Sequence, residues 1–298
     1  MQAHLLRDSR RLNRALPCLK NNRERLPIVK LLALAKSFTL FLEIIMDITD
    51  IRKCAQAFAT YYLESFYIVV TYNGNGFILI GETDNFPHLI GISKQIYNSN
   101  GYRTPKKLYR DIADGQSIST KIVPNVISTT SKMYKKVRNF ISNRDVLISN
   151  SCPIILRYDP QKSNRKLNNV DILISDLNKG YMLGWIYNAK IRVNSDIDIT
   201  KYCISTWIDE SDGTVQGKEK YMPGQDVELI KTVLVFDKNS ELLRQKEYKY
   251  SAKQKLQILD SCCRNNCNLL LDDNNARNYI KLAKEKNILC SINGVIHT

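Results

Sequence analysis

The sequence predicts an α+β protein in which N-terminal helices pack on a small antiparallel β-sheet, followed by a helical C-terminal tail. Three observations support this prediction. Segments with helical spacing come first, runs rich in β-branched and aromatic residues then follow one another, and helical spacing returns near residue 251. Because these runs do not alternate with helices, an antiparallel sheet is favoured over a doubly wound parallel one.

The chain is expected to contain a main domain over residues 46–250 with an extension at each end. Residues 1–45 carry nine Lys or Arg against three Asp or Glu, and are predicted to be a basic N-terminal extension. This stretch either lies upstream of a true start at Met46, sits outside the core, or is a basic arm that touches nucleic acid or a membrane surface. Residues 251–298 are predicted to be a helical C-terminal extension.

The main domain is expected to begin with a capped helix. Asp47 and Asp50 supply the cap, and apolar residues recur at helical spacing from Ile51 to Tyr62. A β-hairpin is predicted next, because the β-rich runs 66–70 and 77–80 flank the turn sequence at 73–76, Asn-Gly-Asn-Gly.

Three further helices are expected before the main run of strands. One runs from about Pro87 to Tyr97, and a second begins at Thr104 and ends near Gly115. The third covers residues 128–140. Its inward face is apolar and consists of Met133, Val137, Phe140 and Ile141. Its outward face is basic and consists of Lys132, Lys135, Lys136 and Arg138.

The remaining elements are mostly strands. The β-runs cover residues 146–149, 154–158, 171–175, 181–187, 202–207, 227–236 and 242–250. From Ser251 the spacing is helical again, and Asp272 opens a last helix that runs to Lys286. Asp171 and Asp176 fall on opposite faces of one strand, so they do not predict a paired-carboxylate metal site.

Charge points to a polyanion partner. The chain has 44 Lys and Arg against 29 Asp and Glu, which gives a formal net charge of +15. Such a surplus attracts nucleic acid or anionic lipid. The alternative is an AT-rich genome that raises the Lys, Asn and Ile content without any such partner.

The eight cysteines indicate reduced thiols in a cytoplasm rather than a disulfide framework. The densest group, Cys262, Cys263 and Cys267 with Cys290, lacks a paired CxxC, so a helix with small semi-apolar residues is favoured over a zinc site. We therefore predict no metal and no cofactor. The most apolar stretch, residues 26–46, is interrupted by charges, so no membrane span is expected.

Histidine is rare, and His88 is the one suited to proton transfer. The other two, His4 and His297, lie near the ends of the chain. His88 stands where the predicted hairpin gives way to a helix, a place where functional groups are often displayed. The alternative is that it caps this helix or bonds the backbone. A serine or cysteine hydrolase is disfavoured, because an elbow motif and a spare histidine are both missing.

The run from Phe86 to Ile92 (Phe-Pro-His-Leu-Ile-Gly-Ile) resembles the F-x-H-L-x-G signature of the phage BECR-type (Barnase, EndoU, colicin, RelE) nuclease domains. Later segments follow the order of that family: the helix ending near Gly115, then residues 134–140, 171–175, 205–207 and 221–225. The resemblance covers roughly residues 60–240 and implies a metal-independent ribonuclease of toxins and mobile elements, with helices on a small antiparallel sheet.

The resemblance also assigns roles to particular residues. A ribose 2′-OH attacking a phosphate needs a base and an acid, for which His88 is first choice, with Ser205 or Gln225 as its partner. Lys135 is the candidate that balances the charge of the phosphorane. Nucleic-acid contacts are expected from Lys94, Lys132, Lys136 and Arg138. Each has an alternative reading: the lysines as a solvated face, Ser205 as a strand hydrogen bond and Gln225 as a turn residue.

The function predicted from these observations is cleavage of host or phage RNA, including tRNA, to a cyclic phosphate. An antitoxin or immunity protein is the expected protein partner. One alternative is a catalytically inactive member of the fold that binds nucleic acid or protein. Another is a membrane-surface protein that uses residues 1–45. Trp185, Trp207 and Tyr221 are expected either to stack on bases or to belong to the core.

Overall fold

The computed structural model describes residues 46–149, 152–163, 166–177, 181–194, 197–209 and 221–297. The predictions for residues 1–45 lie outside this range. Seven strands pair in the order β1-β2-β6-β5-β4-β3-β7, and β7 pairs again with β1. They are β1 (Ser65–Thr71), β2 (Gly76–Ile80), β3 (Pro153–Arg157), β4 (Ile172–Asp176), β5 (Tyr181–Asn194), β6 (Ile197–Asp209) and β7 (Asp226–Asp237).

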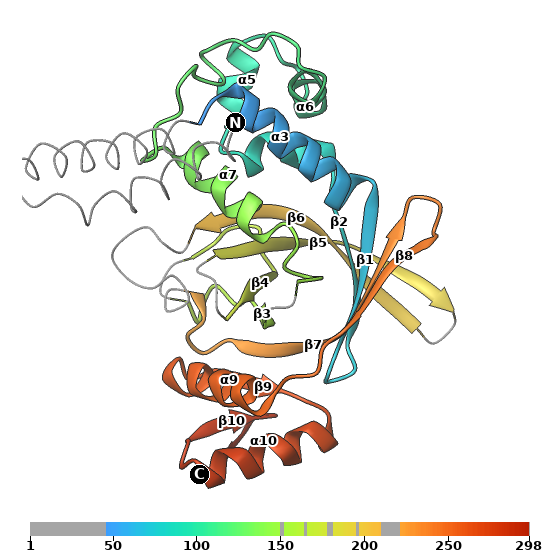
Figure 1. Ribbon diagram of the computed structural model, residues 1–298, viewed down its shortest axis with the longest axis vertical. Helices are drawn as coiled ribbons and strands as arrows, with labels where there is room; N and C mark the ends of the chain where they lie inside the picture. The colour runs from blue at the N-terminus through green and yellow to red at the C-terminus, as the bar shows by residue number, and fades with distance from the viewer. Residues whose placement is uncertain are drawn as a thin grey trace, which may run out of the picture. The chain divides into compact units, whose positions relative to one another are not determined.

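This closed barrel shows that the predicted small antiparallel sheet is wrong, although the mixture of helices and strands is present (Figure 1). The predicted hairpin exists, but it inserts between β6 and β7 and closes the sheet. Its β2 runs parallel to β6, with Leu79 opposite Tyr202, and its β1 runs antiparallel to β7, with Val69 opposite Val233. These partners are far apart along the chain, so local periodicity could not reveal the closure. The predicted strand at 146–149 is a turn.

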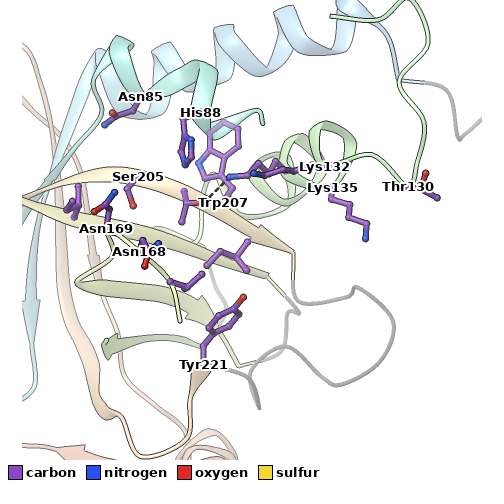
Figure 2. Close-up of a pocket in the computed structure, with 15 residues that line it drawn as sticks. Asn85, His88, Thr130, Lys132, Lys135, Asn168, Asn169, Ser205, Trp207 and Tyr221 are labelled. Carbon is purple, nitrogen blue, oxygen red and sulfur yellow. Dashed lines mark hydrogen bonds between the residues drawn. The ribbon is translucent and has the colours of Figure 1, made fainter. Parts of the chain in front are cut away.

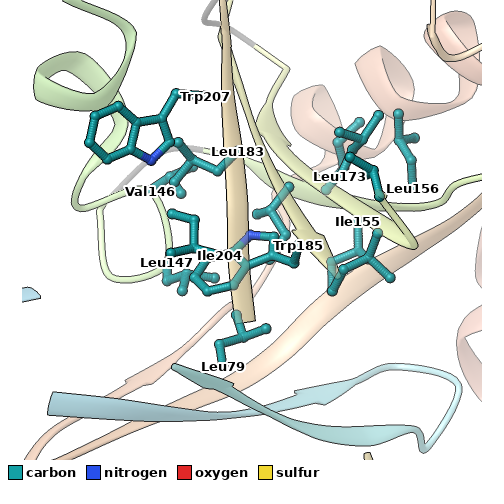
Figure 3. Packing of buried hydrophobic residues seen from close by; sticks show 14 of the residues in the cluster. Leu79, Val146, Leu147, Ile155, Leu156, Leu173, Leu183, Trp185, Ile204 and Trp207 are labelled. Carbon is teal, nitrogen blue, oxygen red and sulfur yellow. The ribbon is translucent and has the colours of Figure 1, made fainter. Parts of the chain in front are cut away.

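Side chains from all seven barrel strands share one hydrophobic cluster, part of which Figure 3 shows. Trp185 of β5 is fully buried and lies in the same cluster as Leu79 of β2, Ile155 of β3 and Ile204 of β6. Burial of such large apolar side chains stabilises the fold by roughly 1.5–3 kcal/mol per residue. The barrel is therefore a packed core.

The helices before β3 are α3 (Ile48–Phe58), α4 (Phe86–Leu89), α5 (Lys94–Ser99), α6 (Pro105–Ala113) and α7 (Lys132–Asn143). The predicted cap of α3 is confirmed, since the Asp47 carboxylate accepts from the backbone N–H of Thr49 and Asp50. One predicted helix is instead two, because the chain turns at Gly91 between α4 and α5. In Figure 1 these helices lie over one side of the barrel.

The C-terminal extension is only partly helical. It contains α9 (Ala252–Arg264) and α10 (Asp273–Glu285), as predicted, but also β9 (Asn268–Leu270), β10 (Cys290–Ile292) and β11 (Val295–His297). β9 runs parallel to β7, so the extension continues the main sheet. Strand β8 (Leu242–Glu247) pairs with the far half of β7. Within the described residues, no helix combines the length and the apolar character needed to cross a membrane.

Candidate active site

A pocket with a volume of about 870 Å³ opens between α4, α7, strands β5 and β6, and the loop from β3 to β4 (Figure 2). It gathers most of the polar side chains that the sequence singled out, together with several that it did not. The lining residues are Asn85, His88, Thr130, Lys132, Lys135, Lys136, Leu167, Asn168, Asn169, Ile186, Ser205, Thr206, Trp207, Ile208 and Tyr221.

Residues around His88 explain how α4 presents it to the pocket. Phe86 is fully buried, and the Asn85 amide donates to the Ile204 carbonyl at 3.0 Å, which ties the start of α4 to β6. Gly91 has φ +90°, and a Cβ there would lie 3.3 Å from the Met133 backbone. Only glycine meets both demands without strain. The motif thus brings α4 against the first turn of α7.

His88 is itself exposed to solvent at the pocket. Its pKa is lowered, first by partial burial and then by the positive charges of Lys136 and Lys132. A lowered pKa favours the neutral imidazole near pH 7, the form that accepts a proton. In the described part of the chain no side chain hydrogen-bonds this imidazole.

Lys136 is buried, so its predicted place on the outward face of the helix is wrong. It is 8% exposed, and its Nζ donates to Thr206 Oγ1 at 2.9 Å. Burial, and then the charge of Lys132, lower its pKa to about 7. Within the described residues no carboxylate pairs with this ammonium. A signal for burial existed, since Lys136 is three residues after Met133 and four before Phe140 on the inward face.

Thr206, the partner of Lys136, depends on a small neighbour. It lies opposite Gly184 in the β5–β6 pairing. A Cβ on Gly184 would come within 2.8 Å of Thr206 Cγ2, so glycine is required for Thr206 to keep this place. Sequence reasoning overlooked Thr206, because a threonine in a strand is usually only a good strand former.

The other cations divide between the pocket and the surface. Lys132 and Lys135 line the pocket. In Figure 2 the Lys135 ammonium points away from His88. Lys94 on α5 and Arg138 on α7 are exposed and do not line the pocket. The predicted inward position of Ile141 is also wrong, because that side chain is 38% exposed.

The two predicted partners of His88 are engaged with the backbone. Ser205 lines the pocket, but its hydroxyl donates to the Gly184 carbonyl at 3.2 Å. Gln225 is fully buried and does not line the pocket. Its side chain accepts from the Asp159 N–H at 2.7 Å and donates to the Asp159 carbonyl at 2.9 Å. Gln225 therefore holds the loop after β3 in place.

The aromatic residues considered for base stacking belong to the core. Trp185 and Trp207 are at most 1% exposed, and Trp207 stacks on Phe140 with ring centroids 4.0 Å apart. Tyr221 lines the pocket but is 4% exposed. Stacking on a base therefore requires a rearrangement at each of them.

Side chains that commonly bind metals do not converge in the described residues, where no group of three or more His, Cys, Asp or Glu is placed to hold a metal ion. Cys262 and Cys267 are buried at the end of α9 and just after it, and burial contributes to the raised pKa of Cys262, after a hydrogen bond with Cys267. Cys263 is half-buried. These cysteines lie in the C-terminal extension and none of them lines the pocket.

Comparison with known proteins identifies a family for the part of the chain that contains the whole pocket. The family described as phage-Barnase-EndoU-ColicinE5/D-RelE like nuclease4 matches residues 50–223, more than half of the chain. No curated protein and no solved structure matches the chain. The matched range includes every pocket residue and stops before Gln225. The chain therefore belongs to this family of phage-associated, nuclease-like domains.

Proposed function

We propose that this domain is a ribonuclease that cleaves RNA by transesterification and needs no metal ion. One observation carries the proposal. His88, whose pKa is lowered, shares a pocket with Lys136, which is buried without a carboxylate partner in the described residues. A phosphate bound there would supply the missing negative charge and lie within the field of both side chains.

In the proposed reaction His88 acts as the base. The neutral imidazole takes the proton of a ribose 2′-OH while the 2′-oxygen bonds to the neighbouring phosphorus. The bond from phosphorus to the 5′-oxygen then breaks, and this oxygen receives a proton from Lys136, whose pKa is about 7. Lys132 adds positive charge near the phosphorane. The products carry a cyclic phosphate and a 5′-hydroxyl.

The test is to incubate the full chain and its His88→Ala variant with total RNA in excess EDTA. We expect the wild type to leave cyclic phosphate ends, and the variant to be slower by roughly 10²–10⁴-fold, the usual contribution of a general base. Because His88 is exposed, the variant should keep its fold, which circular dichroism checks. His297→Ala, on β11, is the matched control. Equal cleavage by wild type and His88→Ala would refute the proposal.

A second candidate, a binding protein without catalysis, is favoured by one observation. Ser205 and Gln225, the predicted partners of His88, both bond the backbone instead. A binder should leave RNA intact and tolerate His88→Ala. Its affinity should fall steeply as salt increases, because counterions compete for the phosphates.

The kind of RNA that is cleaved and the protein partner are part of the same proposal. The net charge of +15 supports a polyanionic substrate, for which we propose host or phage RNA, including tRNA. An antitoxin or immunity protein stays a prediction from the family resemblance, and a bacterial cytoplasmic location stays a prediction from the cysteines and that resemblance.

A further inference from the structure

The proposed chemistry uses only one wall of the pocket. His88, Lys132 and Lys136 come from α4 and α7, whereas Leu167, Asn168 and Asn169 come from the loop between β3 and β4. The volume of about 870 Å³ lies within the range of roughly 300–1,000 Å³ that is typical of sites for whole small molecules. The pocket therefore has room for a nucleotide with its base, beyond a phosphate alone.

The β3–β4 loop is held in place on both sides of the two asparagines. The Leu167 N–H donates to the Tyr158 hydroxyl at 2.9 Å, and the Asp171 N–H donates to the Trp185 carbonyl at 2.8 Å. Val170 between them is 7% exposed. A loop anchored in this way can present side chains in a fixed direction, which is what recognition of a ligand requires.

The two asparagines are free to bind a ligand. Both are exposed, both line the pocket, and neither carboxamide has a hydrogen-bond partner in the described residues. Figure 2 shows them beside Ser205, across the pocket from Lys132. Asn169 has φ 58°, a left-handed conformation that asparagine tolerates better than most residues. Hydrogen bonding among the described residues therefore leaves both carboxamides on this pocket wall available to a ligand.

We propose that Asn168 and Asn169 read the base of a nucleotide beside the scissile phosphate of single-stranded RNA. A carboxamide offers a donor and an acceptor side by side, which matches the paired donor and acceptor on the edge of an unpaired base. The cations hold the phosphate while the asparagines select the base. The proposal rests on the proposed ribonuclease function, but base selection can be measured without cleavage.

The test uses the full chain with His88→Ala, so that bound RNA stays intact. Fluorescence anisotropy measures Kd for labelled single-stranded oligo(A), oligo(C) and oligo(U) at one salt concentration. We expect one homopolymer to bind about tenfold more tightly than the others, and Asn168→Ala or Asn169→Gly to reduce that preference. Glycine is used at 169 because it tolerates the positive φ. Asn98→Ala, an exposed asparagine on α5, should change nothing.

A second arm maps cleavage sites in total RNA for wild type, Asn168→Ala and Asn169→Gly. A shift in the nucleotide flanking the cut, with the phosphate chemistry unchanged, supports the proposal. Equal Kd values for the three homopolymers, or a preference that both variants keep, would overturn it. If wild type fails to cleave but binds one homopolymer selectively through Asn168 or Asn169, the ribonuclease function fails and base reading stands.

Discussion

Two largely buried cations of this molecule differ in what surrounds them. Arg157 on β3 donates from Nε to Glu228 Oε1 at 2.5 Å and from a terminal nitrogen to the Tyr202 hydroxyl at 3.0 Å. Burial works to lower the pKa of Arg157, but its hydrogen bond and ion pair with Glu228 raise it. Among the described residues Lys136 bonds a hydroxyl, that of Thr206, and no carboxylate, and its pKa falls to about 7. The fold supplies a counter-charge to the first cation, whereas no carboxylate of the described residues pairs with the second.

Removing the counter-charge of Arg157 should cause the largest loss of stability. Glu228 is 1% exposed, so Glu228→Gln leaves Arg157 without its counter-charge. Loss of one partner of a buried pair costs roughly 3–5 kcal/mol, and we expect about 3 kcal/mol because the Arg157 side chain is 27% exposed. Urea unfolding measures this change, with the exposed Glu247→Gln on β8 as control. If both variants are as stable as wild type, the ion pair does not hold the barrel together.

Replacing Lys136, with which no carboxylate of the described residues pairs, should reduce activity instead. Lys136→Met should slow RNA cleavage by roughly 10²–10³-fold, the cost of removing a group that stabilises transition-state charge. Its free energy of unfolding should stay the same or rise, because an isolated buried charge is removed. Lys135→Met is the matched comparison, and we expect less than about a tenfold loss from it because Lys135 points away from His88. The reverse order of losses would assign the phosphate to Lys135.

The sequence could predict the elements that depend on neighbouring residues, but not those that depend on contacts between distant segments. Local signals were sufficient for the capped helix after Asp47 and for the hairpin around Gly74, since each depends on neighbouring residues. His88 lies after the hairpin at the start of the helices, as the local pattern indicated, but the pocket that it lines is formed by segments distant in the sequence. Closure of the barrel depends on β1 meeting β7, a contact between distant segments, whereas the order of the strand runs and the resemblance both led to a small antiparallel sheet.

Lys136 and Gln225 show why the site was predicted only in part. Lys136 was placed outward because lysine is usually solvated, although its helical spacing places it with Met133 and Phe140. Gln225 is a candidate for catalysis by the resemblance, but its backbone N–H donates to the Met222 carbonyl, which agrees with the alternative reading as a turn residue, and its side chain bonds Asp159. Spacing shows which residues share a face. It does not show which polar side chains find partners, because that depends on the tertiary packing.

Stability should also depend on pH in a way that separates Lys136 from Arg157. Lys136 has an ordinary pKa of 10.5 when unfolded and about 7 when folded, so between these values the unfolded chain binds a proton that the folded chain lacks. Wild-type stability should therefore rise with pH relative to Lys136→Met, by at most about 1.4 kcal/mol per pH unit. The penalty for the buried charge is complete below pH 7, so the stability advantage of the methionine variant should shrink from pH 7 towards pH 10.

The Arg157 pKa is raised, so this cation does not titrate between pH 6 and pH 10. The difference in stability between wild type and Glu228→Gln should therefore stay level over the range in which the Lys136 difference changes. Urea unfolding of wild type and both variants at each pH measures the two differences under identical conditions. A level difference for Lys136→Met would mean that water or a bound anion keeps this ammonium charged, and its role as a proton donor near pH 7 would fall while its role in binding phosphate would remain.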